Sequence, residues 1–177
     1  DCNDLTYTPV RREGAHGFQV DGYALDPERG ELHVAVCDFR QEPELQSLNQ
    51  ATIDTLCRRV ERFVVASMRP DFINGLEESS PAFQAAQPIY ELRASITRVR
   101  VVIFSNARLA SRKKGVEARD LAGRIFTFNL LDFTRYVSIQ DSRGGSEPIE
   151  IDLGELDEDP LECLEAHAGD GKYAAYL

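Results

Sequence analysis

Residues 18–39 hold the feature that most constrains the fold, which is two alternating runs joined by turn residues. Apolar and polar side chains alternate along Phe18–Leu25, as they do in a half-buried β-strand. Pro27 and Gly30 then supply turn chemistry, because proline fixes φ and glycine accepts a left-handed backbone. The stretch Glu31–Phe39 returns with its even-numbered apolar residues on one face. These residues predict an antiparallel β-hairpin.

Two helices and a central strand are predicted after the hairpin. Asn49–Met68 carries apolar residues three and four positions apart, which is typical of an amphipathic helix, and Ser47 is its expected N-cap. The pair Ser-Pro that opens Ser80–Ser95 predicts a second helix, with a kink or break at Pro88. The β-branched stretch Arg98–Phe104 predicts a central strand.

The rest of the chain predicts a mixture of short elements. In order, we expect a helical turn at Glu117–Leu121, a strand at Arg124–Leu130, a helix at Phe133–Ile139 capped by Asp132, an edge strand at Pro148–Leu153 and an acidic loop at Gly154–Asp170. Helices between strands indicate an α/β domain with a mixed β-sheet and flanking helices. At 177 residues the chain has the size of one domain, and we expect residues 1–177 to be the amino-terminal fragment of a longer chain.

The net charge of −10 bears on the choice of partners. A field of this sign repels phosphate backbones, so nucleic-acid binding is possible but disfavoured. Arg11-Arg12 and the loop Arg108–Lys114 are the basic runs that could still contact phosphate, although a solvated loop is the more ordinary interpretation. The apolar runs are too short to cross a bilayer, and we expect no membrane partner.

Four cysteines occur without a CxxC pair and without a histidine at metal-ligand spacing. They are Cys2, Cys37, Cys57 and Cys163. This distribution predicts reduced, partly buried thiols in a cytoplasmic protein rather than a disulfide framework. The three histidines lie far apart, and His33 is expected to be structural.

The candidate chemistry lies in the acidic residues of the hairpin. Asp21 is on the first strand, Glu31 begins the second, and Asp38 ends it. Metal-dependent phosphodiester cleavage needs carboxylates that converge on a divalent cation, together with a group that activates water. Restriction-endonuclease-like enzymes place an Asp on the first strand of such a hairpin and an acidic residue, a spacer and a Lys on the second. Here Val36 occupies the acidic position and Asp38 the Lys position.

Two interpretations of these acids remain open. In one, Asp21 and Asp38, with Glu31, form a divergent catalytic site whose Asp21 and Asp38 hold Mg²⁺ or Mn²⁺. In the other, the two aspartates are strand-end or turn residues on a solvated rim. The dipeptide Asp21-Gly22 also has the composition of a β-bulge.

Longer segments of the chain resemble a known family. The hairpin stretches Val20–Asp26 and Glu31–Phe39 resemble the amino-terminal part of the abortive infection phage resistance (AIPR) proteins. Leu121–Arg135 is similar to a strand and helix of that family, and the segments from Ile149 to Leu177 are similar to the stretch that leads to its main conserved region. The resemblance covers most of the chain from Phe18 onward.

The resemblance implies a bacterial intracellular protein of phage defence, with a restriction-endonuclease-like (PD-(D/E)XK-type) core in this region. Our leading hypothesis is a catalytically degenerate nuclease-like module that acts by binding the remainder of its own chain or another protein subunit. One alternative is an active, divergent metal-dependent nuclease that cleaves DNA or RNA. The other is an interaction domain without ancestral catalysis, whose sheet edge near Pro148–Leu153 pairs with a partner.

Overall fold

The computed structural model describes residues 5–14, 16–42, 44–110, 116–141, 163–168 and 171–176. The chain divides into two compact units, residues 1–144 and 145–177, and each is described by itself. The prediction of a single domain over 1–177 therefore stays a prediction. The first unit contains the strands β1 (Thr6–Arg12), β2 (Phe18–Asp26), β3 (Glu31–Asp38), β4 (Ser47–Leu48), β5 (Arg98–Ser105), β6 (Arg108–Leu109), β7 (Val116–Leu121) and β8 (Arg124–Leu131), and the helices α1 (Gln50–Ser67), α2 (Pro70–Asn74), α3 (Pro81–Glu91) and α4 (Phe133–Asp141).

A six-stranded mixed sheet in the order β1-β2-β3-β5-β8-β7 organises the first unit. The hairpin prediction is confirmed, because β2 and β3 pair antiparallel with Leu25 opposite Leu32. Strand β5 is central, as predicted, and runs parallel to β3 on one side and to β8 on the other. The α/β class and the mixed sheet with flanking helices are therefore confirmed. A further parallel pair joins the short strands β4 and β6.

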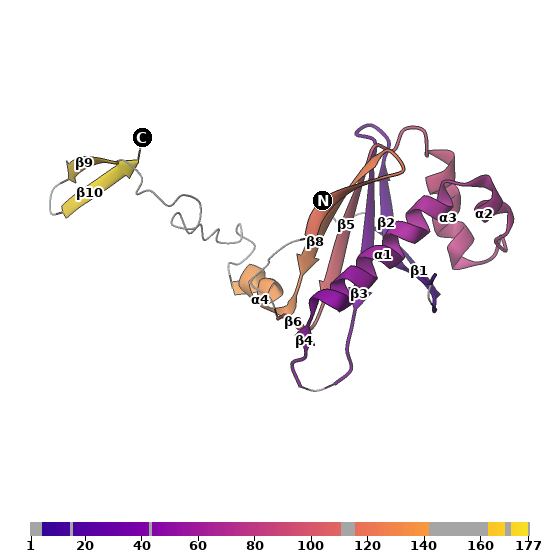
Figure 1. The fold of residues 1–177 in the computed structure, drawn as a ribbon, viewed down its shortest axis with the longest axis horizontal. Helices are drawn as coiled ribbons and strands as arrows, with labels where there is room; N and C mark the ends of the chain where they lie inside the picture. The colour runs from indigo at the N-terminus through magenta and orange to yellow at the C-terminus, as the bar shows by residue number, and fades with distance from the viewer. Residues whose placement is uncertain are drawn as a thin grey trace. The chain divides into compact units, whose positions relative to one another are not determined.

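Helix α1 lies across one face of this sheet (Figure 1). Its predicted apolar stripe is buried, at Ile53, Leu56, Val60, Phe63 and Val64. The stripe packs in one core with the even-numbered residues of β3 and the odd-numbered residues of β5. The chain therefore passes from β3 to its parallel neighbour β5 through a helix that buries this stripe. A helical connection is the usual way to join parallel strands.

The helix begins differently from the prediction, which placed the N-cap at Ser47. The N-cap is Asn49, whose Oδ1 accepts a hydrogen bond from the Thr52 N–H at 2.9 Å. Ser47 lies instead in β4, because Leu48 is fully buried and its segment pairs with β6. Both residue types suit an N-cap, so the tertiary pairing of Leu48 decides which one is used.

Helix α3 begins at Pro81 with Ser80 as its N-cap, as predicted, and continues through Pro88 without a break. Proline has no N–H to donate to the carbonyl four residues before it. The Tyr23 hydroxyl donates to that carbonyl, of Gln84, at 3.2 Å, so a strand side chain replaces the missing helical bond. The helix ends at Glu91 rather than near Ser95.

Helix α3 ends early because the segment that follows it is hydrogen-bonded to the turn between β2 and β3. The N–H groups of Thr97 and Arg98 donate to the Gly30 carbonyl, so the chain must leave the helix to reach β5. Gly30 has φ +64°, and a Cβ there would lie 2.6 Å from the Ser95 carbonyl oxygen. The turn glycine thus supplies a left-handed backbone and close contact at once.

The helical turn predicted at Glu117–Leu121 is wrong, because these residues form most of β7, which pairs antiparallel with β8. The two strands are joined by Ala122-Gly123, both with positive φ. Positive φ at both central residues is the geometry of the tight hairpin turn that matches strand twist. Pairing with β8 across the sheet, rather than local composition, therefore makes this segment a strand.

The remaining short helices and strands agree with the predictions in part. Asp132 caps α4 as predicted, since its Oδ1 accepts from the Arg135 N–H at 2.9 Å. Helix α2 lies between the two predicted helices, in a segment for which no element was predicted. In the second unit, β9 (Cys163–Ala168) and β10 (Gly171–Tyr176) form an antiparallel pair, which corrects the loop prediction for the first of them. The predicted strand Pro148–Leu153 lies outside the described residues.

The full burial of Phe63 predicts a loss of stability when its ring is removed. Phe63 is fully buried, and its ring lies 6.0 Å from that of Phe18 and 6.2 Å from that of Phe72, both edge to face. We expect Phe63→Ala to lower the free energy of unfolding by about 3–5 kcal/mol, because a large cavity remains. Phe133→Ala is the matched control, since Phe133 is 43% exposed, and it should leave stability nearly unchanged. Urea denaturation measures both, and equal losses would contradict the assigned core.

Candidate functional site

Asp21 lies where the pairing between β2 and β3 changes. The regular register of this pair is seen from Asp26–Glu31 to Gly22–Ala35. Beyond it, Asp21 Oδ2 accepts a hydrogen bond from the Cys37 N–H at 2.7 Å, and Gln19 Nε2 donates to the Cys37 carbonyl at 3.0 Å. Two side chains therefore replace the backbone partners that β2 would otherwise give Cys37. Asp21 is buried, and its other oxygen lies 3.4 Å from Arg11 Nη2.

The burial pattern of β2 agrees with an irregularity at this point. Phe18 and Val20 pack with the core on one side of Asp21-Gly22, and Tyr23 and Leu25 do so on the other. The alternation thus changes phase, as it does where a strand carries one extra residue. The pairing of β1 with β2 also shifts register between Tyr7 and Val10. This is the bulge-like arrangement that the Asp-Gly composition suggested.

Asp38 ends β3 within a different set of hydrogen bonds. Its Oδ2 accepts from Ser105 Oγ at 3.0 Å and from Arg40 Nε at 3.2 Å. Ser105 in turn accepts from the Ala107 N–H, and Arg40 exchanges two backbone hydrogen bonds with the Asn106 amide. The carboxylate therefore ties the end of β3 to the end of β5.

Glu31 is held by arginine at the opposite end of β3. It is 5% exposed, and its two oxygens accept bidentate hydrogen bonds from Arg100 at 2.7 and 2.8 Å. Arg98 and His33 lie 3.8 and 3.5 Å away. The hydrogen bonds from Arg100, with the charges of Arg100, His33 and Arg98, hold the pKa of Glu31 below its ordinary value against the effect of burial.

The structure does not bring these three acids together. Glu31 and Asp38 stand at the two ends of β3, which at about 3.3 Å per residue places them about 23 Å apart. Among the described residues, no group of three or more His, Cys, Asp or Glu side chains could hold a metal ion. The chain has three lysines, Lys113, Lys114 and Lys172, and none is on the hairpin.

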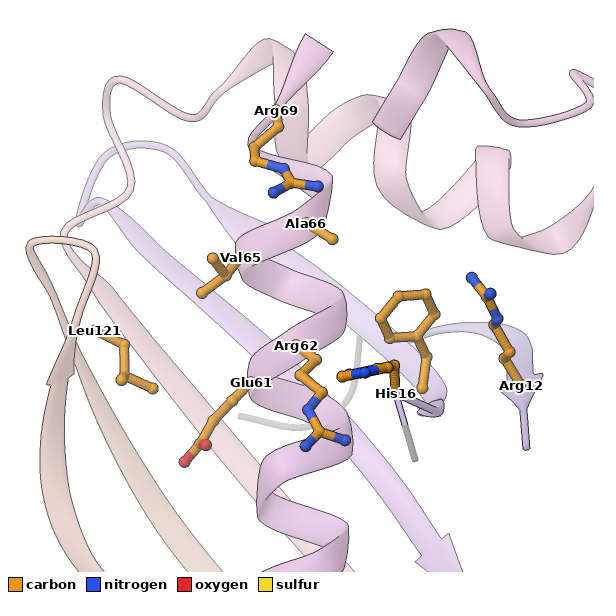
Figure 2. A pocket seen from close by; sticks show the side chains of 9 residues that line it. Arg12, His16, Glu61, Arg62, Val65, Ala66, Arg69 and Leu121 are labelled. Carbon is orange, nitrogen blue, oxygen red and sulfur yellow. The ribbon is translucent and has the colours of Figure 1, made fainter. Parts of the chain in front are cut away.

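A pocket of about 450 Å³ lies over α1 (Figure 2). Its lining is rich in cations and apolar groups: Arg12, His16, Phe18, Glu61, Arg62, Val65, Ala66, Arg69 and Leu121. Arg12 belongs to a basic run that the sequence marks, whereas Arg62 in α1 and Arg69 just after it carry no such signal. The polar face of α1 was the available signal, and it gains meaning only when β1 and β7 are placed beside it.

The cysteines and the basic loop are the remaining groups that the sequence marks for possible chemistry or binding. Cys37 and Cys57 are free cysteines, and burial raises the pKa of both thiols, that of Cys57 to about 12. Neither thiol is therefore poised as a nucleophile. The basic loop is described only up to Ala110, where Arg108 and Leu109 form β6. No helix among the described residues is long and apolar enough to cross a membrane.

Substitution of Asp21 tests whether its hydrogen bond to the Cys37 N–H stabilises the domain. Asp21→Ala leaves the Cys37 N–H without its acceptor, which should lower the free energy of unfolding by about 1–3 kcal/mol. Asp21→Asn keeps an acceptor oxygen and should cost clearly less. Thermal and urea unfolding of both variants measure the difference. Equal stability of Asp21→Ala and the parent chain would show that the hydrogen bond does not matter.

The lowered pKa of Glu31 predicts that the stability of the domain depends on pH. A carboxyl group whose pKa is lowered on folding contributes stability above its unfolded pKa and loses it as pH falls through the folded pKa. The ion pair with Arg100 should therefore stabilise the chain at neutral pH and fade below about pH 4.3. Glu31→Gln should lower stability at pH 7 and flatten this acid-side loss. The exposed Glu78→Gln is the control, and an identical pH profile in both variants would refute the assignment.

Comparison with known proteins places the chain in a family. Residues 2–137 match the family model described as the abortive infection phage resistance protein N-terminal domain. The comparisons with curated proteins and with solved structures found no match. The match to the family model covers well over half of the 177 residues, including the whole six-stranded sheet. The chain therefore belongs to the abortive infection phage resistance family and carries its N-terminal domain.

Proposed function

We propose that this domain is a nuclease-like scaffold without catalysis, and that it acts in a bacterial, cytoplasmic phage-defence protein by binding the remainder of its own chain or another subunit. One observation carries the first part of the proposal. Asp21, which would be the first metal ligand of a nuclease hairpin, uses Oδ2 to accept the Cys37 N–H at 2.7 Å. A carboxylate in this position serves the backbone of the next strand.

The order of the elements supports a restriction-endonuclease-like ancestry. The antiparallel strands β1, β2 and β3 precede α1, and β5 then returns parallel to β3. Such a core carries its metal ligands on this hairpin, and Asp21 lies just beyond Gly22–Ala35, where the regular β2–β3 pairing ends. The scaffold suits a metal site, and the side chains at that place do not.

The charges around the acids support the loss of catalysis. Arg11 lies beside Asp21 and Arg40 beside Asp38. A bound arginine lowers the attraction of a carboxylate for a cation. A guanidinium also stays protonated in proteins, so it cannot take the part of a lysine that gives up a proton to activate water.

The second face of the sheet supports the binding part of the proposal. Helices α1 and α3 pack on the face that carries Leu32 and Val34. On the opposite face Ile125 is 48% exposed, beside the exposed Arg98 and Thr127. Parallel strands are usually covered on both faces, so this surface fits a partner that buries it.

A nuclease assay tests the first part. We expect the 177-residue chain to leave DNA and RNA intact with Mg²⁺ or Mn²⁺, and Asp21→Asn to behave identically. The asparagine removes the ligand charge and keeps the hydrogen bond from Cys37. Metal-dependent cleavage that disappears in Asp21→Asn or Asp38→Asn would overturn the proposal and establish the active, divergent nuclease.

Phage infection of cells that carry the full-length protein extends the same test. Protection should survive Asp21→Asn and be lost in Ile125→Asp, which places a charge on the open sheet face. Arg108→Asp is the control for a charge change at an exposed position elsewhere. Protection retained in Ile125→Asp would contradict a role for this face.

A further inference from the structure

We propose that the pocket over α1 binds a free nucleoside phosphate, with the phosphates on its arginines and the base against its apolar wall. This site is separate from the hairpin acids and does not depend on the proposed function. The pocket is formed by the end of β1, the turn that leads into β2, the second half of α1 with the residue that precedes α2, and the end of β7. Its volume of about 450 Å³ lies within the range typical of small-molecule sites.

The charge of the lining favours an anion. Three arginines line the pocket, Arg12, Arg62 and Arg69, against one carboxylate, Glu61. That carboxylate accepts from Arg119 Nη1 at 2.7 Å, so its charge is already matched from outside the lining. Arg69 also lies 3.4 Å from Asp71, but both side chains are largely exposed, and such a pair contributes little.

The arginines suit phosphate in particular. A guanidinium offers a planar set of donors that matches phosphate oxygens in pairs. In Figure 2, Arg62 lies in the middle of the pocket, with His16 on one side and Glu61 on the other. His16 adds a further nitrogen donor next to Arg62, so this side of the pocket can contact several phosphate oxygens at once.

The other side of the pocket is apolar. Val65 and Leu121 lie across α1 from His16 and Arg12 (Figure 2). Both are partly exposed, so a flat apolar group could cover them. An elongated molecule with a charged end and an aromatic end fits this arrangement, and a nucleoside phosphate is such a molecule. Inorganic phosphate alone would use only half of the site.

A free nucleotide is a better match than a nucleic acid. The chain carries a net charge of −10, which repels a long polyanion whose phosphates extend beyond the pocket. A single nucleotide places its charge only where the arginines outnumber the carboxylates.

Calorimetric titration of the 177-residue chain with ADP tests the proposal. We expect ADP to bind, adenosine to bind at least about tenfold more weakly because it lacks the charge-assisted hydrogen bonds, and inorganic phosphate to bind more weakly as well. ADP should also raise the unfolding temperature. A single-stranded oligonucleotide that binds while ADP does not would overturn the proposal in favour of backbone recognition.

Substitutions locate the binding site. Arg12→Gln and Arg69→Gln should each weaken ADP binding by about tenfold, since each removes a charged donor. Arg108→Gln is the matched control, because Arg108 is exposed and lies outside the lining. Both lining residues are exposed in the unliganded chain, so the variants should unfold at the parental temperature.

A substitution at Leu121 tests the contribution of the apolar wall. Leu121→Ala should weaken ADP binding severalfold and leave binding of inorganic phosphate unchanged, because only the base contacts this side chain. Absence of ADP binding at millimolar concentration would overturn the proposal. Equal ADP affinity in Arg12→Gln, Arg69→Gln and Arg108→Gln would overturn it too.

Discussion

The hydrogen bond from the Cys37 N–H to the Asp21 carboxylate is the interaction on which this end of the sheet depends. Strand β3 lies between β2 and β5, so its backbone groups need hydrogen-bond partners from the neighbouring strands. Where β2 carries an irregularity, its backbone no longer reaches Cys37. Asp21 and Gln19 span the gap from the side, one as acceptor and one as donor. The acid is buried for that reason.

The same constraint explains why the three acids of the hairpin do not converge. Each carboxylate solves a local problem at its own place along β3. Asp38 joins the ends of β3 and β5 through Ser105, and Glu31 neutralises the arginines that face it from β5. A buried carboxylate is tolerated when it is paired, and each of these is. The contacts of Asp38 with Ser105 and of Glu31 with Arg100 depend on the parallel pairing of β3 and β5, which lies outside the hairpin.

Sequence patterns predicted the elements whose burial is strongly periodic. The β2–β3 hairpin, the stripe of α1 and the β-branched β5 repeat their apolar residues with a clear period, so local pattern and tertiary packing agree. Strand β7 was missed because it is a short edge strand in which half of the side chains are charged. Its conformation comes from pairing with β8 through a turn, Ala122-Gly123, that lacks the usual Asn or Asp.

The candidate sites divide in the same way. Asp21 and Asp38 could be found from the hairpin, but their partners Cys37 and Ser105 are known only from the pairing of the strands. The arginine pocket could not be predicted at all, because Arg12 and Arg62 are fifty residues apart and meet only when α1 lies on the sheet. Net charge is equally uninformative there. A chain of −10 still has a surface where guanidinium groups outnumber carboxylates, since three arginines and one carboxylate line the pocket over α1. An anion approaching the domain meets that local surplus rather than the average.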